Sequence, residues 1–340
     1  MRATEPWLAT VLPVLNEEEH IEACLNSLIH QSLPAEEHII IVLDGGSNDS
    51  TKEIIERVRN EAEGKDSPKI HLHDNPGRFV PHARNRALQL LPESITHLLE
   101  FNGHIDVGAT HLVDLKSVWD RLEKQHPRLA GLGCRVVGHG DGISTTESIL
   151  DSTLDSPLGG STGQFARFGE EGPTNVPAFA LHSRKAIEAV DGWDESFLTS
   201  QDSDLSMRLR KAGFVLFRTP TVTVKMRRRT SFKSWFLMSH RYGFWRTKVL
   251  LKHPRRIVFR ELLPLFGLII TLFLCTMKLK LALIPILAYL GVLFLVGISQ
   301  LRKGIPHVFG VPFSLALLHT GFTIGLLDGL IRKGRKSNDR

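Results

Sequence analysis

The sequence predicts an α/β protein with a mostly parallel sheet, followed by a C-terminal α-helical membrane domain. Two observations support this fold class. In the N-terminal part, apolar β-branched runs alternate with segments of helical periodicity, the pattern of a sheet covered on both faces. From residue 261 to residue 331 the chain is strongly apolar, although hydrophobic residues make up only 42% of the 340 residues.

The elements of the α/β part follow in order along the chain. Strands are expected at residues 8–12, 38–43, 69–73 and 96–101, and helices at 16–32, from residue 50 onward, and at 82–91. Polar clusters at residues 13–17, 44–49 and 102–106 each follow an expected strand. Because ligands of parallel sheets bind beyond the carboxyl ends of the strands, these clusters predict one shared site.

The apolar part contains three candidate membrane spans, at residues 262–277, 281–298 and 311–331. Each is near the length of about 20 residues that a bilayer core requires, although the first is short. Three spans would place the basic tail of Lys333, Arg335 and Lys336 outside the cell, whereas two would keep it inside. The sequence leaves both topologies open.

Residues 231–260 mix aromatic and basic side chains. This composition favours a helix lying in the membrane interface, and buried core aromatics are the rival interpretation. The aromatic residues are Trp235, Phe236, Tyr242, Phe244 and Trp245. We therefore expect three regions: an α/β domain at 1–230, an interfacial helical region at 231–260, and membrane helices with a basic tail at 261–340.

The net charge of +6 is concentrated just before the apolar block. A basic cluster there suits an anionic lipid surface or a phosphate-bearing acceptor, and its position next to membrane segments argues against nucleic-acid binding. The three cysteines, Cys24, Cys134 and Cys275, form no metal-ligand pair, as is typical of a reducing compartment. The N-terminus has no apolar stretch of signal-peptide length, so we expect the α/β domain to be cytoplasmic, at a cell membrane.

Two motifs at the ends of the first strands carry a resemblance. They are Pro13-Val14-Leu15-Asn16-Glu17 and Asp44-Gly45-Gly46-Ser47-Asn48-Asp49-Ser50-Thr51. They resemble the opening motifs of the inverting GT-A glycosyltransferases of family 2. The resemblance implies a GT-A fold, in which Pro13, Asn16 and Glu17 line the base and ribose pocket and Asp44 accepts a hydrogen bond from the base. A simpler interpretation is that Asn16 and Ser50 cap helices.

The next two motifs concern the diphosphate of the donor. Arg78 and Arg84 lie near the start of the third expected helix, where cations and a helix N-terminus suit phosphate, with a solvated arginine face as the alternative. After the fourth strand the family carries D-x-D, but this chain has Asn102-Gly103-His104. The D-x-H pattern of the succinoglycan-biosynthesis branch is similar. By this resemblance His104 is a ligand of Mn²⁺ or Mg²⁺ and Asn102 its neutral partner, although a lone His is more often structural.

The last motifs resemble the acceptor half of the family. Gly192-Trp193-Asp194-Glu195 is followed by Gln201-Asp202-Ser203-Asp204-Leu205 and then by Arg208 and Gly213. The resemblance implies that Asp202 is the catalytic base, with Trp193, Asp194, Gln201, Asp204 and Arg208 serving the acceptor or diphosphate. The simpler interpretation is an acidic first helical turn. Ser156-Pro157-Leu158-Gly159-Gly160-Ser161 also fits the succinoglycan branch, and Arg229, within Arg227-Arg228-Arg229, is a candidate for gripping phosphate or a solvated basic rim.

Together these features predict a membrane-anchored transferase. It would move a sugar with inversion from a nucleotide-sugar, expected to be UDP-linked, to a lipid-linked or polysaccharide acceptor, in contact with membrane lipids and without nucleic acid. The altered metal motif leaves a second hypothesis open, a catalytically weak nucleotide-sugar-binding scaffold. The apolar tail alone suggests a third, a transporter or flippase subunit, but transport needs no catalytic base.

Overall fold

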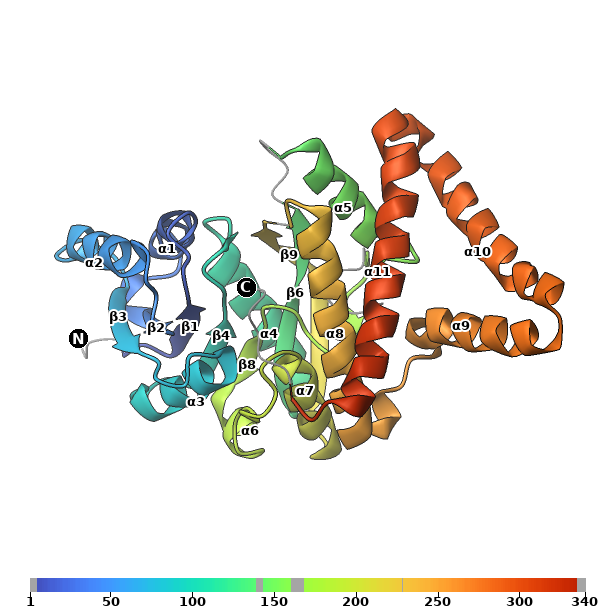
Figure 1. Ribbon diagram of the computed structural model, residues 1–340. Coiled ribbons are helices and arrows are strands. Elements are labelled where there is room, and N and C mark those ends of the chain that lie inside the picture. The colour runs from blue at the N-terminus through green and yellow to red at the C-terminus, as the bar shows by residue number, and fades with distance from the viewer. Residues whose placement is uncertain (1–4, 139–142, 160–167, 228, 335–340) are drawn as a thin grey trace. The chain divides into compact units, whose positions relative to one another are not determined.

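The computed structural model describes residues 5–138, 143–159, 168–227 and 229–334 (Figure 1). The chain divides into two compact units. The first contains residues 1–139 and 163–227, and the second contains residues 140–162 and 228–340. Several residues singled out in the sequence lie outside the described ranges, namely Gly160, Ser161, Arg228, Arg335 and Lys336.

The first unit is built on a mixed sheet in which four neighbouring strands run parallel, in the order β3-β2-β1-β4. These strands are β1 (Leu8–Val14), β2 (His38–Asp44), β3 (Lys69–Asp74) and β4 (His97–Glu100). Buried apolar side chains make up most of β1 and β2, as the apolar runs predict, whereas only Ile70 is buried in β3. Their carboxyl ends therefore lie along one edge of the sheet.

The remaining strands of the described sheet extend it beyond β4. Strand β8 (Leu181–Ser183) is antiparallel to both β4 and β6 (Leu129–Gly138), and β9 (Val215–Met226) runs parallel to β6. Two short strands, β5 (Ile105–Asp106) and β7 (Gly172–Pro173), pair antiparallel with β9. The predicted mostly parallel sheet is confirmed.

Helices cover both faces of this sheet, because successive strand residues point to opposite sides. Leu8, Leu12 and Val14 of β1 pack toward α1 (Ile21–Ile29), α2 (Thr51–Ala62) and α4 (His111–Gln125). Ala9 and Val11 pack toward α3 (Val80–Leu90), α6 (Arg184–Glu188) and α7 (Gln201–Lys211). The first unit is thus a three-layer α/β/α structure with apolar cores on both sides of the sheet.

The second unit is helical. It contains α5 (Thr145–Asp155), α8 (Phe232–Lys252), α9 (Phe259–Met277), α10 (Leu279–Ser299) and α11 (Ile305–Ile331). Short 3₁₀ segments at Pro254–Arg256 and Leu301–Lys303 precede α9 and α11. Helix α5 packs on α11 through Ile149, Val311 and Leu315, so this segment belongs with the C-terminal helices although it precedes α6 and α7 in the chain.

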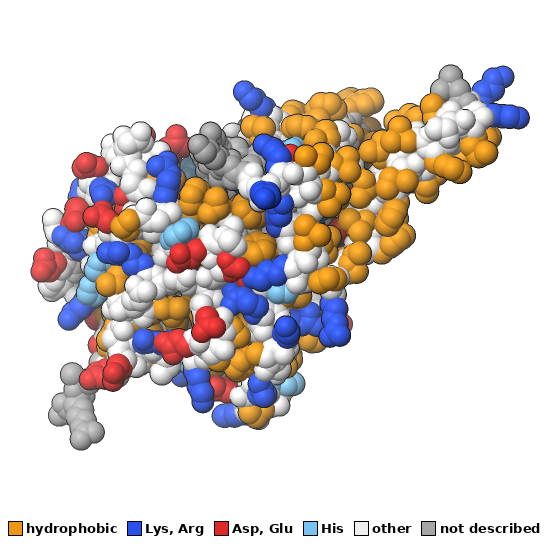
Figure 2. All heavy atoms as spheres, turned by 60° about the horizontal axis from the view of Figure 1, so that its bottom comes forward, with side chains coloured by type: hydrophobic (Ala, Val, Ile, Leu, Met, Phe, Trp, Pro, Cys, Tyr) orange, Lys and Arg blue, Asp and Glu red, His pale blue; other side chains and the backbone are white. Residues whose placement is uncertain are grey.

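Three described helices, α9, α10 and α11, are long and apolar enough to cross a membrane. Figure 2 shows apolar side chains covering the arm that α9 and α10 form. Helix α8 corrects one expectation, because Trp235, Phe244 and Trp245 are buried and the rival interpretation of core aromatics holds for them. The side chain of Tyr242 is exposed by 39%, and the location of α8 at the membrane stays a prediction.

Candidate active site

The loops that follow β1 and β2 are joined by hydrogen bonds. The backbone N–H of Asn16 donates to Ser47 Oγ at 2.9 Å, and the N–H of Asn48 donates to Asn16 Oδ1 at 2.9 Å. The N–H of Glu17 donates to Thr51 Oγ1 at 2.8 Å. The two motifs predicted to bind the donor base and ribose are therefore one continuous polar surface.

The helix-capping interpretation of these motifs is wrong in both places. Helix α1 begins at Ile21, four residues after the motif, and Asn16 has a left-handed φ of 54°. Ser50 occupies the N-cap position of α2 without a capping side-chain bond, and Asp49 Oδ1 accepts the N–H of Thr51 instead, at 3.0 Å. Asn16 is tolerated in the left-handed region better than most residues, and its side chain is used to join the loops.

Asp44 holds the loop after β2 in place. Its fully buried carboxylate accepts the N–H groups of Gly46 at 3.0 Å and Ser47 at 3.1 Å. Lys52 Nζ lies 3.3 Å from the Asp44 carboxylate and 2.9 Å from that of Asp74. Hydrogen bonds to Asp74 and Asp44 raise the pKa of Lys52 and keep it cationic. The hydrogen bond predicted between the donor base and Asp44 stays a prediction. In the structure the Asp44 carboxylate is already hydrogen-bonded within the protein.

The loop after β3 contacts the loop after β2. A Cβ added at Gly45 would lie 2.5 Å from the carbonyl oxygen of Arg78, so glycine is required for this approach. Arg78 has a left-handed φ of 64°, and its side chain is exposed. Pro13, half-buried in β1, pairs in register with Leu43 of β2 beside these loops. An exposed guanidinium therefore adjoins the surface made by the first two motifs.

Arg84 lies in a buried ion-pair network, which the sequence does not predict. Its Nη1 is 3.1 Å from Glu100 Oε1, and His182 Nε2 is 3.4 Å from the same oxygen. The Arg84 guanidinium also lies 5.6 Å from the centre of the Trp193 ring. The Arg84 side chain is 6% exposed, so the alternative of a solvated arginine face is wrong for Arg84. A donor contact by Arg84 stays a prediction, and its burial does not favour it.

Glu100 remains an anion inside this network. Burial alone would raise its pKa, but the nearby Arg84 guanidinium and His182 imidazole outweigh burial and lower the pKa. The network connects α3, β4, β8 and the loop before α7. The loop that contains Trp193 packs on this network through the Arg84 guanidinium.

His104 lies at the end of β4 and contacts Glu17. Its Nδ1 is 2.9 Å from Glu17 Oε1, and the two side chains are 36% and 19% exposed. Gly103 makes room for this contact, because a Cβ there would lie 2.9 Å from Glu17 Cγ. Asn102 is half-buried, and its carbonyl oxygen accepts the thiol hydrogen of Cys24 at 3.4 Å. The first and third motifs thus meet through a carboxylate–imidazole pair.

This pair fits a divalent metal. Imidazoles that bind metals through one nitrogen usually donate the other N–H to a carboxylate, and the Glu17–His104 contact has that form. No group of three or more His, Cys, Asp or Glu side chains in the described ranges could hold a metal by itself. Mg²⁺-type sites are commonly completed by substrate phosphates and water, so one protein ligand with a diphosphate is a suitable donor set.

The loop before α7 is clamped by α3. Asn85 Oδ1 accepts the N–H of Trp193 at 2.8 Å, while Asn85 Nδ2 donates to the Trp193 carbonyl at 2.8 Å and to Glu195 Oε1 at 3.0 Å. Gly192 has a φ of 69°, and a Cβ there would lie 2.6 Å from Asn85 Oδ1. Asp194 Oδ1 accepts the N–H of Ser196 at 2.9 Å. The predicted acceptor motif is therefore held rigidly.

Helix α7 presents Asp202 in its first turn. Ser200, in the left-handed region with a φ of 63°, turns the chain into the helix, and Gln201 and Asp202 follow half-buried. The N–H of Ser203 donates to Asp202 Oδ1 at 2.8 Å. In the same turn, the buried Asp204 accepts from Arg208 Nε at 2.7 Å. This pair, together with a bond from Arg208 to the Val190 carbonyl, fixes the turn that carries Asp202.

The sheet register brings the basic motif beside the metal motif. Ile105 of β5 pairs with Met226 of β9 in antiparallel register, so the next residues outward are His104 and Arg227. Arg227 is exposed at the end of the first unit. Arg229, the other described arginine of this motif, belongs to the second unit and is half-buried. A cation next to His104 suits an anionic ligand.

The structure joins the loops that carry Asn16, Asp44 and Arg78, and it brings Glu17 into direct contact with His104. It also places the Arg84 guanidinium beside the Trp193 ring. The sequence reasoning missed Glu100 and His182, and it associated Asn85 with the nucleotide and not with the Trp193 loop that it holds. A carboxylate at the end of an apolar strand could have drawn attention to Glu100. No sequence pattern around His182 indicates that it contacts Glu100. The convergence of His104 with Asp202 stays a prediction.

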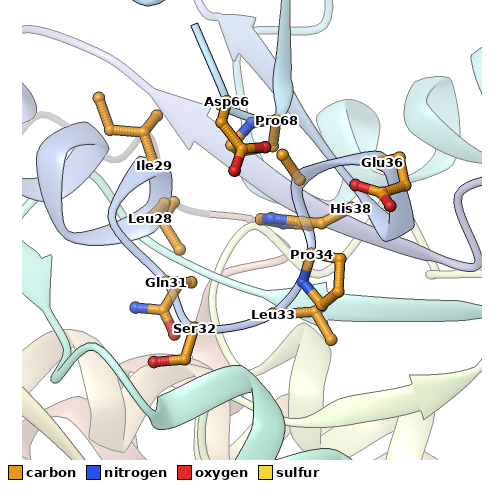
Figure 3. A pocket seen from close by; sticks show the side chains of 11 residues that line it. Leu28, Ile29, Gln31, Ser32, Leu33, Pro34, Glu36, His38, Asp66 and Pro68 are labelled. Carbon is orange, nitrogen blue, oxygen red and sulfur yellow. The ribbon is translucent and has the colours of Figure 1, made fainter.

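A cavity of about 320 Å³ lies at the amino end of β2, away from the motifs (Figure 3). Gln31, Glu36, His38 and Asp66 are among its lining residues. His38 is buried, lies 2.8 Å from Thr10 Oγ1, and has its pKa lowered by burial to about 3, so it is neutral. No predicted site residue lines this cavity.

A three-layer α/β/α fold with a polar site along the carboxyl ends of its parallel strands is the architecture of nucleotide-binding α/β proteins. The Glycosyl transferase family 2 model matches residues 10–92. The succinoglycan biosynthesis protein ExoA of Rhizobium meliloti (strain 1021) is 30% identical over 263 residues, which are 75% of this chain and 73% of that relative. The chain belongs to glycosyl transferase family 2 and is a glycosyltransferase that uses nucleotide-sugar donors.

Two further comparisons cover nearly the whole chain. A dolichyl N-acetyl-alpha-D-glucosaminyl phosphate 3-beta-D-2,3-diacetamido-2,3-dideoxy-beta-D-glucuronosyltransferase of Methanococcus voltae is 25% identical over 332 residues, covering 96% of this chain and 98% of that protein. The mannosyltransferase PcManGT of Pyrobaculum calidifontis, solved with GDP-Man and Mn²⁺, has a TM-score of 0.63 at 14% identity, covering 96% of this chain and 87% of that one. The structural likeness confirms the GT-A fold.

Proposed function

We propose that this glycosyltransferase moves a sugar from a UDP-linked donor to a lipid-linked or polysaccharide acceptor at a membrane, with inversion. One observation carries the proposal: the loops after β1, β2, β3 and β4 contact one another along a single edge of the sheet. An extended ligand such as a nucleotide-sugar needs a continuous surface of this kind. Asn16 and Glu17 would face the nucleoside, and Arg78 the phosphates.

His104 would hold the divalent cation, Mn²⁺ or Mg²⁺, through Nε2 while Glu17 fixes the ring through Nδ1. The cation, when bound, supplies positive charge to the departing diphosphate. The structural neighbour solved with Mn²⁺ supports this assignment for the fold. Arg227, next to His104 in the sheet register, would add charge on the same side.

Asp202 would accept the proton of the acceptor hydroxyl. An Asp carboxylate is ionised at neutral pH, so a correctly placed one serves as general base without an unusual environment. The buried Asp204–Arg208 pair holds the turn that carries it, and Asn85 holds the neighbouring Trp193 loop. Attack by the activated hydroxyl on the face opposite the leaving diphosphate gives inversion.

The acceptor is proposed from the relatives and the apolar helices. The Methanococcus voltae relative, which matches over nearly its full length, is named for a dolichyl-linked phosphate acceptor, and the Rhizobium meliloti relative for succinoglycan biosynthesis. A membrane anchor brings such lipid-linked glycans within reach. Gln201, Asp194 and Arg229 are the residues proposed to face this acceptor or its phosphate.

The experiment is a donor screen with the full chain in detergent or lipid nanodiscs. UDP-, GDP- and dTDP-linked sugars are supplied with membrane lipid extract and Mn²⁺ or Mg²⁺, and transfer into the lipid-soluble fraction is measured. We expect transfer from one UDP-sugar, with the opposite anomeric configuration in the product. Transfer only from a GDP- or dTDP-sugar would refute the donor assignment, and a retained configuration would refute the inverting mechanism.

A further inference from the structure

Helix α11 is partnered along its length by α8. Both helices run in the same direction, because Phe232 of α8 meets Phe313 of α11 and Lys248 meets Gly329. Glycines allow the close approach, and a Cβ added at Gly325 would lie 2.1 Å from the carbonyl oxygen of His240. The other glycines in this contact are Gly243, Gly321 and Gly329. Wherever α11 lies, α8 lies with it.

The α8–α11 pair is bound by polar contacts that do not suit hydrocarbon. Lys248 Nζ donates to the carbonyl oxygens of Gly329 and Arg332, at 2.7 Å and 2.5 Å, and His240 Nε2 lies 3.3 Å from Asp328. Helix α8 also carries further cations, namely Lys233, Arg241, Arg246 and Lys252. A Lys or Arg placed at the centre of a membrane helix makes its insertion into the bilayer unfavourable. Taking α11 across the bilayer would take these charges with it.

Helix α5 also binds α11 through polar contacts. Ser148 Oγ lies 3.0 Å from His307 Nε2, and Thr153 shares a hydrogen bond with Ser314 inside the packed unit. In the 18-residue apolar windows, 39% of α11 is buried inside the protein, against 17% of α10 and none of α9. Helix α11 is therefore the candidate span that the protein itself covers most.

Helices α9 and α10 have the opposite character. They are 19 and 21 residues long, which at 1.5 Å per residue is about 28 Å and about 31 Å, close to the thickness of a hydrocarbon core. Large apolar side chains are exposed along both, such as Phe273 at 62% and Phe294 at 68%. Figure 1 shows α9 running crosswise to α11, and parallel axes would project as parallel lines from any viewpoint. The helices α9 and α11 are thus not parallel.

Basic residues favour a hairpin that crosses and returns. Arg255, Arg256 and Arg260 lie before or at the start of α9, and Arg302 and Lys303 follow α10, whereas Lys278 and Lys280 flank the turn between them. The side with more Lys and Arg next to the spans faces the cytoplasm. Both outer flanks belong on that side, which requires an even number of crossings up to α11.

We propose that the chain crosses the membrane twice, through α9 and α10, and that α11 lies with α8 at the membrane surface on the side of the catalytic unit. The partner of the exposed α9–α10 surface is the hydrocarbon of the bilayer. The proposal rests on the membrane anchoring in the proposed function and not on the transfer reaction. It keeps Lys333, at the end of α11, on the cytoplasmic side.

Cysteine labelling of the full chain in intact cells tests this topology. In a Cys275→Ser background, where Cys24 and Cys134 are buried, single variants Lys278→Cys, Lys280→Cys, Lys333→Cys and the catalytic-unit reference Lys65→Cys are treated with a membrane-impermeant maleimide. We expect the turn variants to react in intact cells, and Lys333→Cys and Lys65→Cys to react only after permeabilisation. Reaction of Lys333→Cys in intact cells would show that α11 crosses.

The remaining outcomes also decide the matter. Turn variants that react only after permeabilisation, or that fail to react until the protein is denatured in detergent, would show that α9 and α10 do not cross. Glycosyltransferase activity is measured on the same membranes. An inactive chain with the expected labelling would refute only the proposed function. An active chain with the contrary labelling would refute only the proposed topology.

Discussion

The contact between Glu17 and His104 makes the metal assignment testable by a substitution that spares the metal ligand. Glu17→Gln keeps the size of the side chain and removes its charge. In the structure the Glu17 carboxylate lies 2.9 Å from His104 Nδ1 and is only 19% exposed. We expect the substitution to weaken metal binding by loosening the orientation of the imidazole and lowering its basicity.

The size of the effect follows from the strength of this bond. A hydrogen bond to a charged group contributes about 1.5–3 kcal/mol, and each 1.4 kcal/mol is about tenfold in an equilibrium constant. Glu17→Gln should therefore weaken the affinity for Mn²⁺ by about tenfold to a hundredfold. Measured losses for partners of metal-binding imidazoles fall in the same range, about 10–100-fold.

The assay is a titration of Mn²⁺ into the full chain with nucleoside diphosphate present, followed by the magnetic resonance signal of the free ion. Glu19→Gln is the matched control, because it makes the same change two residues away on a side chain that is 83% exposed. The control should bind Mn²⁺ like the natural protein. Equal affinities for the Glu17→Gln and natural chains would refute the reasoning, and so would an unchanged affinity in His104→Ala.

Three other predictions follow from the structure. Neighbouring charges lower the pKa of Glu100 below its usual 4.5, so the stability that its carboxylate provides is present above that pH and is lost as pH falls through the lowered pKa. Glu100→Gln should therefore lower the free energy of unfolding by about 3–5 kcal/mol near neutral pH and by less in acid. Unfolding measured from pH 7 to pH 3 checks this, and a pH-independent difference would contradict it. Gly325→Ala should lower the stability of the fold by about 1–3 kcal/mol, because the added Cβ would clash with His240. Gly291→Ala, where the Cβ would meet open space, should be neutral or stabilising. Thermal unfolding compares the two variants, and equal effects would exclude the tight contact. Arg78→Ala should raise the KM for the donor more than it lowers kcat, and an unchanged KM in steady-state kinetics would remove Arg78 from the donor site.

The strands and the apolar helices could be predicted because local patterns determine them. The alternation of strand-like and helix-like segments identified β1 to β4, with a clear β-branched run only in β2, and long apolar stretches identified α9 to α11. Contacts distant in sequence could not be predicted. Asn16 looks like a helix cap, yet its role depends on a loop that begins some thirty residues later, and α5 packs on α11 through side chains such as Ser148 that carry no local signal.

The candidate site was predictable in position but not in detail. Strand ends and motif order placed Glu17, Asp44 and His104 on one edge of the sheet. The burial of Arg84 could not be predicted, because a cation on a helix normally faces water and its burial depends on a carboxylate on β4 and on His182 of β8. Glu17 contacts His104 because Gly103 leaves room for it, a steric fact that no sequence pattern encodes.

The central claim is that Asp202 removes the proton from an acceptor hydroxyl beside a bound nucleotide-sugar. Its most direct test is Asp202→Asn in the full chain, assayed for single-turnover transfer and, separately, for binding of the donor nucleotide. We predict a loss of transfer of at least about 10²–10⁴-fold with nucleotide affinity unchanged, since general-base catalysis contributes about this much. Transfer at the natural rate by Asp202→Asn would contradict the assignment of the base.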